Sequence, residues 1–249
     1  MRELISLDIQ DHILCIKINR PEKRNALTLD MYSQLSLAFA DADADPDIRV
    51  VILTGGEGAF SSGNDIVDFV AAGQGEESVK PPRDFLQQIA AFEKPIVAAV
   101  NGVAVGIGTT MLLHCDLIYA SDNARFQLPF VNLGLVPEGG SSLLLPLLVG
   151  HQKASELLLL GEPFDAQQAA AMGLVNRVVE PQALEGLARE QALKLAAKPV
   201  AALLASKQLL KSQQGKSVSQ VIDQEIALFA KHLQSKDAIE ALSGFLKRR

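Results

Sequence analysis

Hydrophobic and polar residues alternate at the start of the chain. Leu4–Ile9 and Ile13–Ile18 each alternate over a strand's length, with the polar run Gln10–His12 between them. Successive side chains of a strand point to opposite faces, so this pattern predicts a β-hairpin with one face toward water. Thr28 then precedes a stretch with helical spacing that reaches about Ala44, and threonine is a favoured helix N-cap. The pattern thus predicts a hairpin followed by a helix.

Three short apolar runs further along the chain have the length and composition of buried strands. They are Val50–Thr54, Pro95–Val100 and Asp116–Ala120. Glycine-containing turns follow the first two runs, and Thr109–His114 after the second turn has the pattern of a helix. A strand, a glycine turn and a helix in this order are typical of an α/β protein.

The segment between the first two runs is different in composition. Ala71–Pro82 is rich in Gly, Glu, Lys and Pro, and this predicts a mobile flap beside a site. Phe85–Phe92 follows it and has the pattern of a short helix that leads into the second apolar run.

Helical patterns dominate the second half of the chain. Ser141–Val149 and Gln152–Leu160 have helical length and leucine-rich faces, and Leu174–Val179 has the pattern of a late strand. From residue 181 onward the sequence predicts amphipathic helices with Gly or Pro between them. These helices are Pro181–Ala197, Pro199–Lys211, Val218–His232 and Lys236–Lys247.

Composition narrows the class of protein. The 249 residues are 48% hydrophobic but only 5% aromatic, so the core is built from Ala, Val, Ile and Leu. A net charge of −6 gives no general attraction to nucleic acid. Cys15 and Cys115 each lie in an apolar run, as reduced core cysteines of a cytoplasmic protein do. The start, Met1–Leu4, carries an early acid and no long apolar run, so no signal peptide is expected. The apolar stretch Ile96–Leu113 is interrupted by Asn101, so no membrane segment is expected.

The two glycine turns predict a site for negative charge. Gly106, Ile107 and Gly108 come directly before the predicted helix, and Gly55–Asp65 follows the earlier strand. N–H groups at a helix start have no intrahelical partner, so two such turns can direct two donors at one oxygen. Close packing is the alternative reason for glycine in such turns. The turns lack the third glycine of a dinucleotide site and the Gly-Lys-Ser/Thr ending of a P-loop, so a nucleotide phosphate site is disfavoured.

One carboxylate, Glu138, lies in the otherwise apolar turn Pro137–Ser142. An acid beside an oxyanion-binding turn suggests proton transfer next to an enolate, although a solvated glutamate is the alternative. Asp41–Asp47 does not form a calcium loop, because Pro46 and Ile52 stand where glycine and glutamate are required. No group of His, Cys and Asp has metal-ligand spacing, so no metal is expected.

Several motifs, taken together and in this order, resemble the crotonase family, which is the enoyl-CoA hydratase/isomerase superfamily. They are Arg24–Leu27, Phe60–Asp65, Lys94–Gly108, Cys115–Leu117 and Leu133–Pro137. The resemblance implies an α/β fold, a spiral of ββα units over residues 1–195 with a C-terminal helical trimerisation region over 196–249. It further implies a homotrimer or dimer of trimers that binds an acyl-CoA thioester. Coenzyme A is then part of the substrate, and no separate cofactor, nucleic acid or membrane partner is expected.

The resemblance also assigns candidate site residues. It implies an oxyanion hole made by the main-chain N–H groups of Asn64 and Ile107. The loop that ends at Arg24 carries three positive charges in five residues, and it could hold a phosphate of coenzyme A, although a solvated loop is the alternative. The residues expected to bind substrate are Arg24, Ala26, Ser62, Gly63, Asn64, Asp65, Ile66 and Gly106.

The departures from the family pattern select a reaction. Thr110 and Phe130 stand where family hydratases carry the two glutamates that activate water, so hydration is not expected. Glu138 instead resembles the peroxisomal-type Δ3,Δ2-enoyl-CoA isomerase branch, in which a glutamate at this position is the catalytic base. The resemblance therefore implies an enzyme in which Glu138 moves a proton from C2 to C4 of a 3-enoyl-CoA. Its apolar surroundings, Phe130, Leu135 and Val136, are expected to raise its pKa.

Three alternatives stay open at this point. A ring isomerase acting on epoxyphenylacetyl-CoA would use an acid at the same turn, and glutamate rather than aspartate weighs against it. A non-catalytic acyl-CoA-binding protein is the second alternative, because both hydratase acids are missing. A serine protease on a related spiral fold is the third. Its nucleophile would be Ser61, Ser62 or Ser141, but the spacing favours no partner among His12, His114, His151 and His232.

Overall fold

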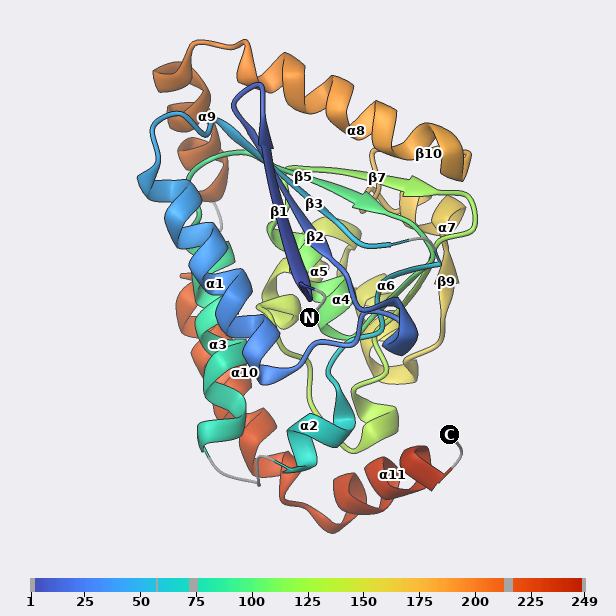
Figure 1. The fold of residues 1–249 in the computed structure, drawn as a ribbon. Coiled ribbons are helices and arrows are strands. Elements are labelled where there is room, and N and C mark those ends of the chain that lie inside the picture. The colour runs from blue at the N-terminus through green and yellow to red at the C-terminus, as the bar shows by residue number, and fades with distance from the viewer. Residues whose placement is uncertain (1–2, 57, 72–75, 213–216, 248–249) are drawn as a thin grey trace.

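Two β-sheets form the centre of the molecule (Figure 1). The computed structural model describes residues 3–56, 58–71, 76–212 and 217–247. In the larger sheet the strand order is β1-β2-β3-β5-β7-β10, and all neighbours pair in parallel except the β1–β2 hairpin. The strands are β1 (Ile5–Gln10), β2 (Ile13–Ile18), β3 (Val50–Thr54), β5 (Ile96–Val100), β7 (Leu117–Ser121) and β10 (Arg177–Val179).

The smaller sheet has the order β4-β6-β8-β9. Its strands are β4 (Ala59–Ser61), β6 (Val103–Val105), β8 (Arg125–Gln127) and β9 (Phe164–Asp165). Strands β3, β5 and β7 of the larger sheet are each followed by the next strand in the smaller one, so the chain passes between the sheets in successive turns. This confirms the α/β spiral that the resemblance implied.

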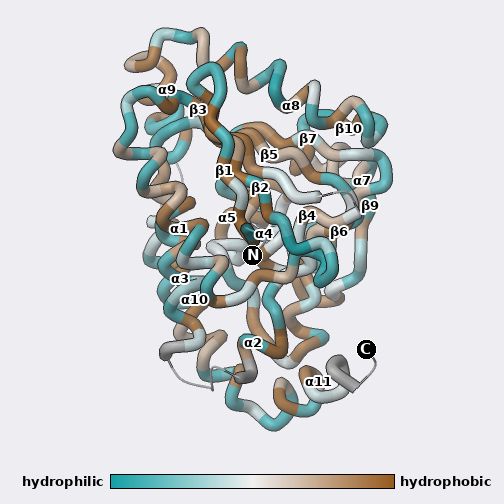
Figure 2. Tube along the Cα trace, viewed as in Figure 1, coloured by the Kyte–Doolittle hydropathy of each residue, from teal (hydrophilic) through white to brown (hydrophobic). Residues whose placement is uncertain are grey.

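Apolar runs explain the position of the central strands. Every residue of β3 and β5 is buried, as expected for parallel strands that are covered on both faces. Helix α8 (Pro181–Ala196) packs against β3, β5 and β7 on one face of the larger sheet. Helices α1 (Leu29–Ala44), α3 (Glu76–Ala91) and α10 (Val218–Leu233) lie along one flank of the molecule (Figure 1). Figure 2 shows hydrophobic residues along the central strands, in brown.

The remaining elements are short or lie at the surface of the molecule. The 3₁₀ segments are η1 (Pro21–Lys23), η2 (Met111–His114) and η3 (Val131–Leu133), and η4 (Glu156–Leu160) is a π-helix. The other helices are α2 (Ile66–Ala71), α4 (Ile107–Thr110), α5 (Ser141–Val149), α6 (His151–Ser155), α7 (Ala166–Ala171), α9 (Val200–Ser212) and α11 (Lys236–Lys247).

Most of the predicted elements are confirmed, including the hairpin, the buried strands and the C-terminal helices. The Thr28 cap is also confirmed, because the N–H of Met31 donates to Thr28 Oγ1 at 3.2 Å. The late strand is shorter than predicted and spans only Arg177–Val179. Sequence patterns missed β8, β9 and α7, because elements of two to six residues are too short to show a periodicity.

The predicted flap is wrong where the structure describes it. Residues 72–75 lie outside the described residues, but α3 begins at Glu76 and contains Pro81 and Pro82. Each proline removes an N–H donor from the helix, which disfavours helix in a sequence-based reading. The helix forms because its inner face is buried: Phe85 and Ile89 are fully enclosed. Burying such a side chain contributes about 1.5–3 kcal/mol, and this outweighs local propensity.

Candidate active site

The first glycine turn lies after β4. Gly63 has φ of +89°, a conformation that favours glycine. Leu27 pairs with Asn64 as a parallel bridge: its N–H donates to Gly63 O and its carbonyl accepts from the N–H of Asp65, both at 2.8 Å. Because the flanking residues bond with Leu27, the N–H of Asn64 itself points to the opposite side of the chain.

The second glycine turn joins β6 to α4. The N–H of Gly106 donates to Gln127 O at 2.9 Å, and the N–H groups of Thr109 and Thr110 donate to Gly106 O. Ile107 is the first residue of α4, so its N–H belongs to the helix-start donors that have no partner within the helix. The positive end of the helix adds to the attraction of this N–H for an anion.

The two turns are in direct contact with each other. A Cβ atom on Gly63 would come within 2.8 Å of the carbonyl oxygen of Val105, and one on Gly108 within 2.5 Å of that of Ser61. Glycine is required at both positions because the backbones approach this closely. Asn64 and Ile107 therefore face one shared space, a cavity of about 480 Å³ that both residues line.

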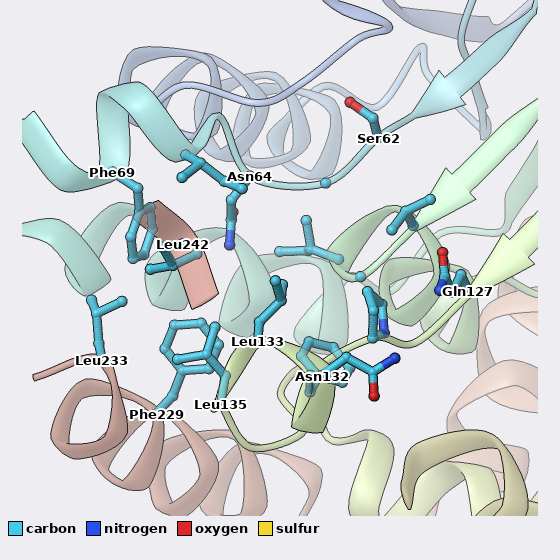
Figure 3. Close-up of a pocket in the computed structure, with 17 residues that line it drawn as sticks. Ser62, Asn64, Phe69, Gln127, Asn132, Leu133, Leu135, Phe229, Leu233 and Leu242 are labelled. Atoms are coloured by element: carbon cyan, nitrogen blue, oxygen red, sulfur yellow. The ribbon is translucent and has the colours of Figure 1, made fainter. Parts of the chain in front are cut away.

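The cavity has a polar end and an apolar end. Ser62 and Asn132 lie at one end, and Phe69, Phe229 and Leu242 lie at the other (Figure 3). Phe69 of α2 and Phe229 of α10 meet edge to face, with ring centroids 6.3 Å apart. The space thus suits a ligand with a polar portion, a central oxygen and an apolar tail.

Glu138 is buried next to the end of α4. It is only 4% exposed, it is not among the residues that line the cavity, and Thr110 Oγ1 donates to its Oε1 at 2.5 Å. Thr110 is the last residue of α4, the helix whose first N–H belongs to Ile107. Burial raises the pKa of Glu138 to about 8; the Thr110 hydrogen bond opposes this rise and the charge of Glu225 adds to it. The raised pKa agrees with the expectation from the sequence.

His114 holds the turn that follows Glu138. Its Nε2 donates to the carbonyl oxygen of Gly139 at 2.8 Å. Burial lowers the pKa of His114 to about 4, so the ring is neutral at physiological pH. His114 is only 5% exposed, in agreement with a core histidine and not with a protease base.

Tyr32 of α1 is a further polar residue of the site, and the sequence did not predict it. Its side chain is fully buried and its hydroxyl donates to Oδ1 of Asn64. The amide nitrogen of Asn64 then points into the cavity (Figure 3). Burial raises the pKa of Tyr32, and the charge of Glu138 raises it further, so Tyr32 lies near the carboxylate as well. A tyrosine within an apolar helix face gives no sequence signal that separates it from ordinary core residues.

The other predicted residues lie around the polar end or beneath it. Ser62, Gly63, Ile66 and Gly106 line the cavity. Arg24 is exposed and its carbonyl accepts from the N–H of Ser62 at 3.0 Å, so its loop borders the rim.

Ala26 and Asp65 are buried and are not among the residues that line the cavity. Asp65 accepts from Arg20 Nη1 at 2.6 Å and from the N–H of Val67 at 3.0 Å, at the start of α2. Burial alone raises the pKa of Asp65, but the hydrogen bonds from Arg20 and the main chain outweigh it and lower the pKa. Asp65 is therefore ionised and held by hydrogen bonds from Arg20 and the main chain, which disfavours it as the catalytic base in place of Glu138.

Among the described residues, no three His, Cys, Asp or Glu side chains are grouped so that they could hold a metal ion. Of the helices in the described segments, none combines the length and the apolar character needed to cross a membrane.

Comparisons with known proteins agree with this geometry. Residues 8–249 match the family described as enoyl-CoA hydratase/isomerase. Enoyl-CoA delta isomerase 2 of Rattus norvegicus is 36% identical over 94% of this chain, and the chain spans 61% of that protein's length.

Two Escherichia coli enzymes match the whole chain over 97% of their own lengths. They are 2,3-dehydroadipyl-CoA hydratase, at 35% identity, and 1,2-epoxyphenylacetyl-CoA isomerase, at 31%. The solved structure of Pseudomonas aeruginosa OdaA is 46% identical, with a TM-score of 0.93, and covers 98% of this chain and 99% of its own.

Proposed function

The chain belongs to the enoyl-CoA hydratase/isomerase family, and within that family we propose that it is an isomerase that converts a 3-enoyl-CoA to the trans-2-enoyl-CoA. One observation carries the proposal: Glu138, the only acid between Phe126 and Gly150, is buried beside α4 with its pKa raised to about 8. A base that must both take and return a proton works best with a pKa near the working pH.

The proposed reaction needs one carboxylate. Thr110 holds Oε1 of Glu138, so Oε2 is the oxygen that takes the proton from C2 of the substrate. The electrons of the broken C–H bond delocalise into a dienolate, whose oxygen accepts from the N–H groups of Asn64 and Ile107. The same carboxyl then returns the proton to C4, and the double bond is left between C2 and C3.

Typical energies and rate effects support these roles for the two oxyanion donors and the base. One oxyanion donor contributes roughly 3 kcal/mol to transition-state stabilisation, and a positioned general base contributes about 10²–10⁴-fold in rate. Thr110 and Phe130 stand at the two positions where family hydratases carry glutamate, and neither side chain can activate water. Thr110 instead donates its hydrogen bond to the proposed base.

The proposed substrate fills the cavity from end to end. The acyl chain lies between Phe69, Phe229 and Leu242, and the thioester lies at the two glycine turns. The loop at Arg24 meets the phosphates of coenzyme A at the polar rim. Coenzyme A thus enters as part of the substrate, and we propose no separate cofactor.

We expect the purified protein to convert 3-hexenoyl-CoA to trans-2-hexenoyl-CoA, measured by the ultraviolet absorbance of the conjugated thioester. Hydration of crotonyl-CoA, assayed beside it, should be at least roughly 10²-fold slower, because one missing acid or base costs about that factor. Efficient hydration without isomerisation would contradict the proposal. Because an E. coli relative is named 1,2-epoxyphenylacetyl-CoA isomerase, that substrate belongs in the same assay, and a clear preference for it would favour the ring isomerase.

We also propose a homotrimer or a dimer of trimers, with residues 196–249 as the assembly region, in the cytoplasm. Large apolar side chains on the surface support an assembly: Leu209 and Leu210 of this region are 65% and 77% exposed, and Leu159 outside it is 63% exposed. Light scattering at micromolar concentration is expected to give three or six times the chain mass of 26.7 kDa. A mass of one chain would contradict this assembly.

A further inference from the structure

A buried carboxylate from the C-terminal part of the chain reaches the turn that carries Glu138. Glu225 of α10 is only 6% exposed. Its Oε2 accepts from the N–H of Gly140 at 2.6 Å, and its Oε1 accepts from the N–H of Ser142 at 2.9 Å. Both oxygens of this side chain are therefore bonded to the main chain within four residues of Glu138.

The turn lacks a cap of its own. Gly140 is the N-cap residue of α5 and has no side chain, so it cannot accept from the free N–H groups at the helix start. Glu225 supplies that acceptor from a position 85 residues away in the chain. Gly139 and Gly140 both have positive φ, near +72°, so glycine is required where the turn bends. The shape of the turn thus depends on the position of α10.

We propose that Glu225 is a positioning residue for Glu138: by holding the N–H groups of Gly140 and Ser142, it makes the placement of the base depend on the docking of helix α10. This inference rests on the proposed function in its kinetic part only. Helix α10 also supplies Phe229 to the apolar end of the cavity. The same helix therefore shapes both the acyl site and the turn of the base.

Electrostatics gives Glu225 a second effect on Glu138. Burial raises the pKa of Glu225 itself, and the hydrogen bonds from Ser142 and Gly140 oppose this rise. Where Glu225 is ionised, its charge raises the pKa of Glu138 beyond the effect of burial. Among the described residues, Tyr32 of α1 and His114 of η2 are further titratable groups near Glu138 or its turn, and His114 is neutral at physiological pH. On the exposed side of α10, Asp223 is paired with Arg83 of α3 at 2.8 Å, and its side chain is 45% exposed.

Three variants separate these effects. Glu225→Gln keeps the length of the side chain but removes the charge and one acceptor. Glu225→Asp keeps the charge but is too short to hold both N–H groups. Asp223→Asn removes a carboxylate from the same helix without touching the turn, and it serves as the matched control.

The first measurement needs no turnover. A carboxyl whose pKa is raised by folding stabilises the folded protein below its unfolded pKa, and this contribution is lost as pH rises through the folded pKa. The free energy of unfolding is therefore measured against pH for the protein and for its Glu138→Gln variant. The difference between the two follows the loss from about pH 4.5 to about pH 8. In the Glu225→Gln background, we expect the loss to be complete at a pH roughly half to one unit lower. In the Asp223→Asn background, we expect this pH window to be unchanged. An unchanged window in folded Glu225→Gln would overturn the electrostatic part.

The second measurement tests placement. Glu225→Asp is expected to lower kcat for 3-hexenoyl-CoA at least roughly tenfold at pH 9, where the base is ionised, while affinity for the inert octanoyl-CoA stays within a few-fold. Equal kcat in Glu225→Asp and Asp223→Asn would overturn the positioning role. A shifted titration in a protein without isomerase turnover would contradict the proposed function and leave the effect of Glu225 on Glu138 intact. If both Glu225 variants unfold while Asp223→Asn does not, Glu225 is a folding residue and the inference is wrong.

Discussion

Replacing Glu138 with glutamine should lower the isomerase rate by about 10²–10⁴-fold, because it removes the base and keeps the shape of the side chain. Affinity for octanoyl-CoA should stay within a few-fold, because glutamine keeps the size of the side chain and leaves every residue that lines the cavity unchanged. Glu162, an exposed acid after η4, offers a matched control, and Glu162→Gln should leave both quantities unchanged. Steady-state kinetics and calorimetric titration measure the two effects.

The pH dependence of the unmodified enzyme belongs to the same prediction. Burial raises the pKa of Glu138 to about 8, so the ionised base becomes more abundant as pH rises through that value. kcat/KM, which reports the free enzyme, should therefore rise roughly tenfold per pH unit below 8 and level off above it. A Glu138→Gln variant that retains most of the rate would move the role of the base to another residue.

A second large loss is expected from Ile107→Pro. Proline is favoured at the first position of a helix, where its fixed φ fits and its missing N–H has no helical partner. The substitution therefore removes one oxyanion donor from α4 with little cost to the helix. We expect kcat/KM to fall by about 10²–10³-fold, the usual effect of losing one such donor.

Ile107→Ala is the matched control for this substitution. Alanine removes more of the buried side chain than proline does, but it keeps the N–H. If the N–H of Ile107 binds the thioester oxygen, the alanine variant should lose far less activity than the proline variant at equal thermal stability. Equal losses would show that packing of the Ile107 side chain, and not its N–H, matters to the reaction.

The sequence predicted the features that depend on residues close together along the chain. Apolar runs identified the buried strands, and Gly63 and Gly106 marked turns in which the structure shows positive φ. Both turns could therefore be placed from local pattern alone. That they contact each other, with Gly63 against Val105 O, follows from the pairing of β4 with β6, which no local pattern specifies.

The network around the base could not be predicted in the same way. Tyr32, Thr110 and Glu225 come from α1, α4 and α10, and they approach Asn64 or Glu138 only through tertiary packing. Each is a buried polar residue within a helix, where its sequence pattern matches that of a surface or core position. The error over residues 76–82 has the related cause that burial of α3 outweighs the local effect of two prolines.

Isomerisation of 3-hexenoyl-CoA deuterated at C2 tests the central claim, proton transfer by a single carboxylate, most directly. Because Glu138 is only 4% exposed, exchange of its proton with water is slow in the proposed mechanism. Mass spectrometry of the first product should therefore find trans-2-hexenoyl-CoA with a substantial share of the deuterium at C4. A product that carries only solvent hydrogen at C4 from the first turnover, or no product at all, would contradict the mechanism.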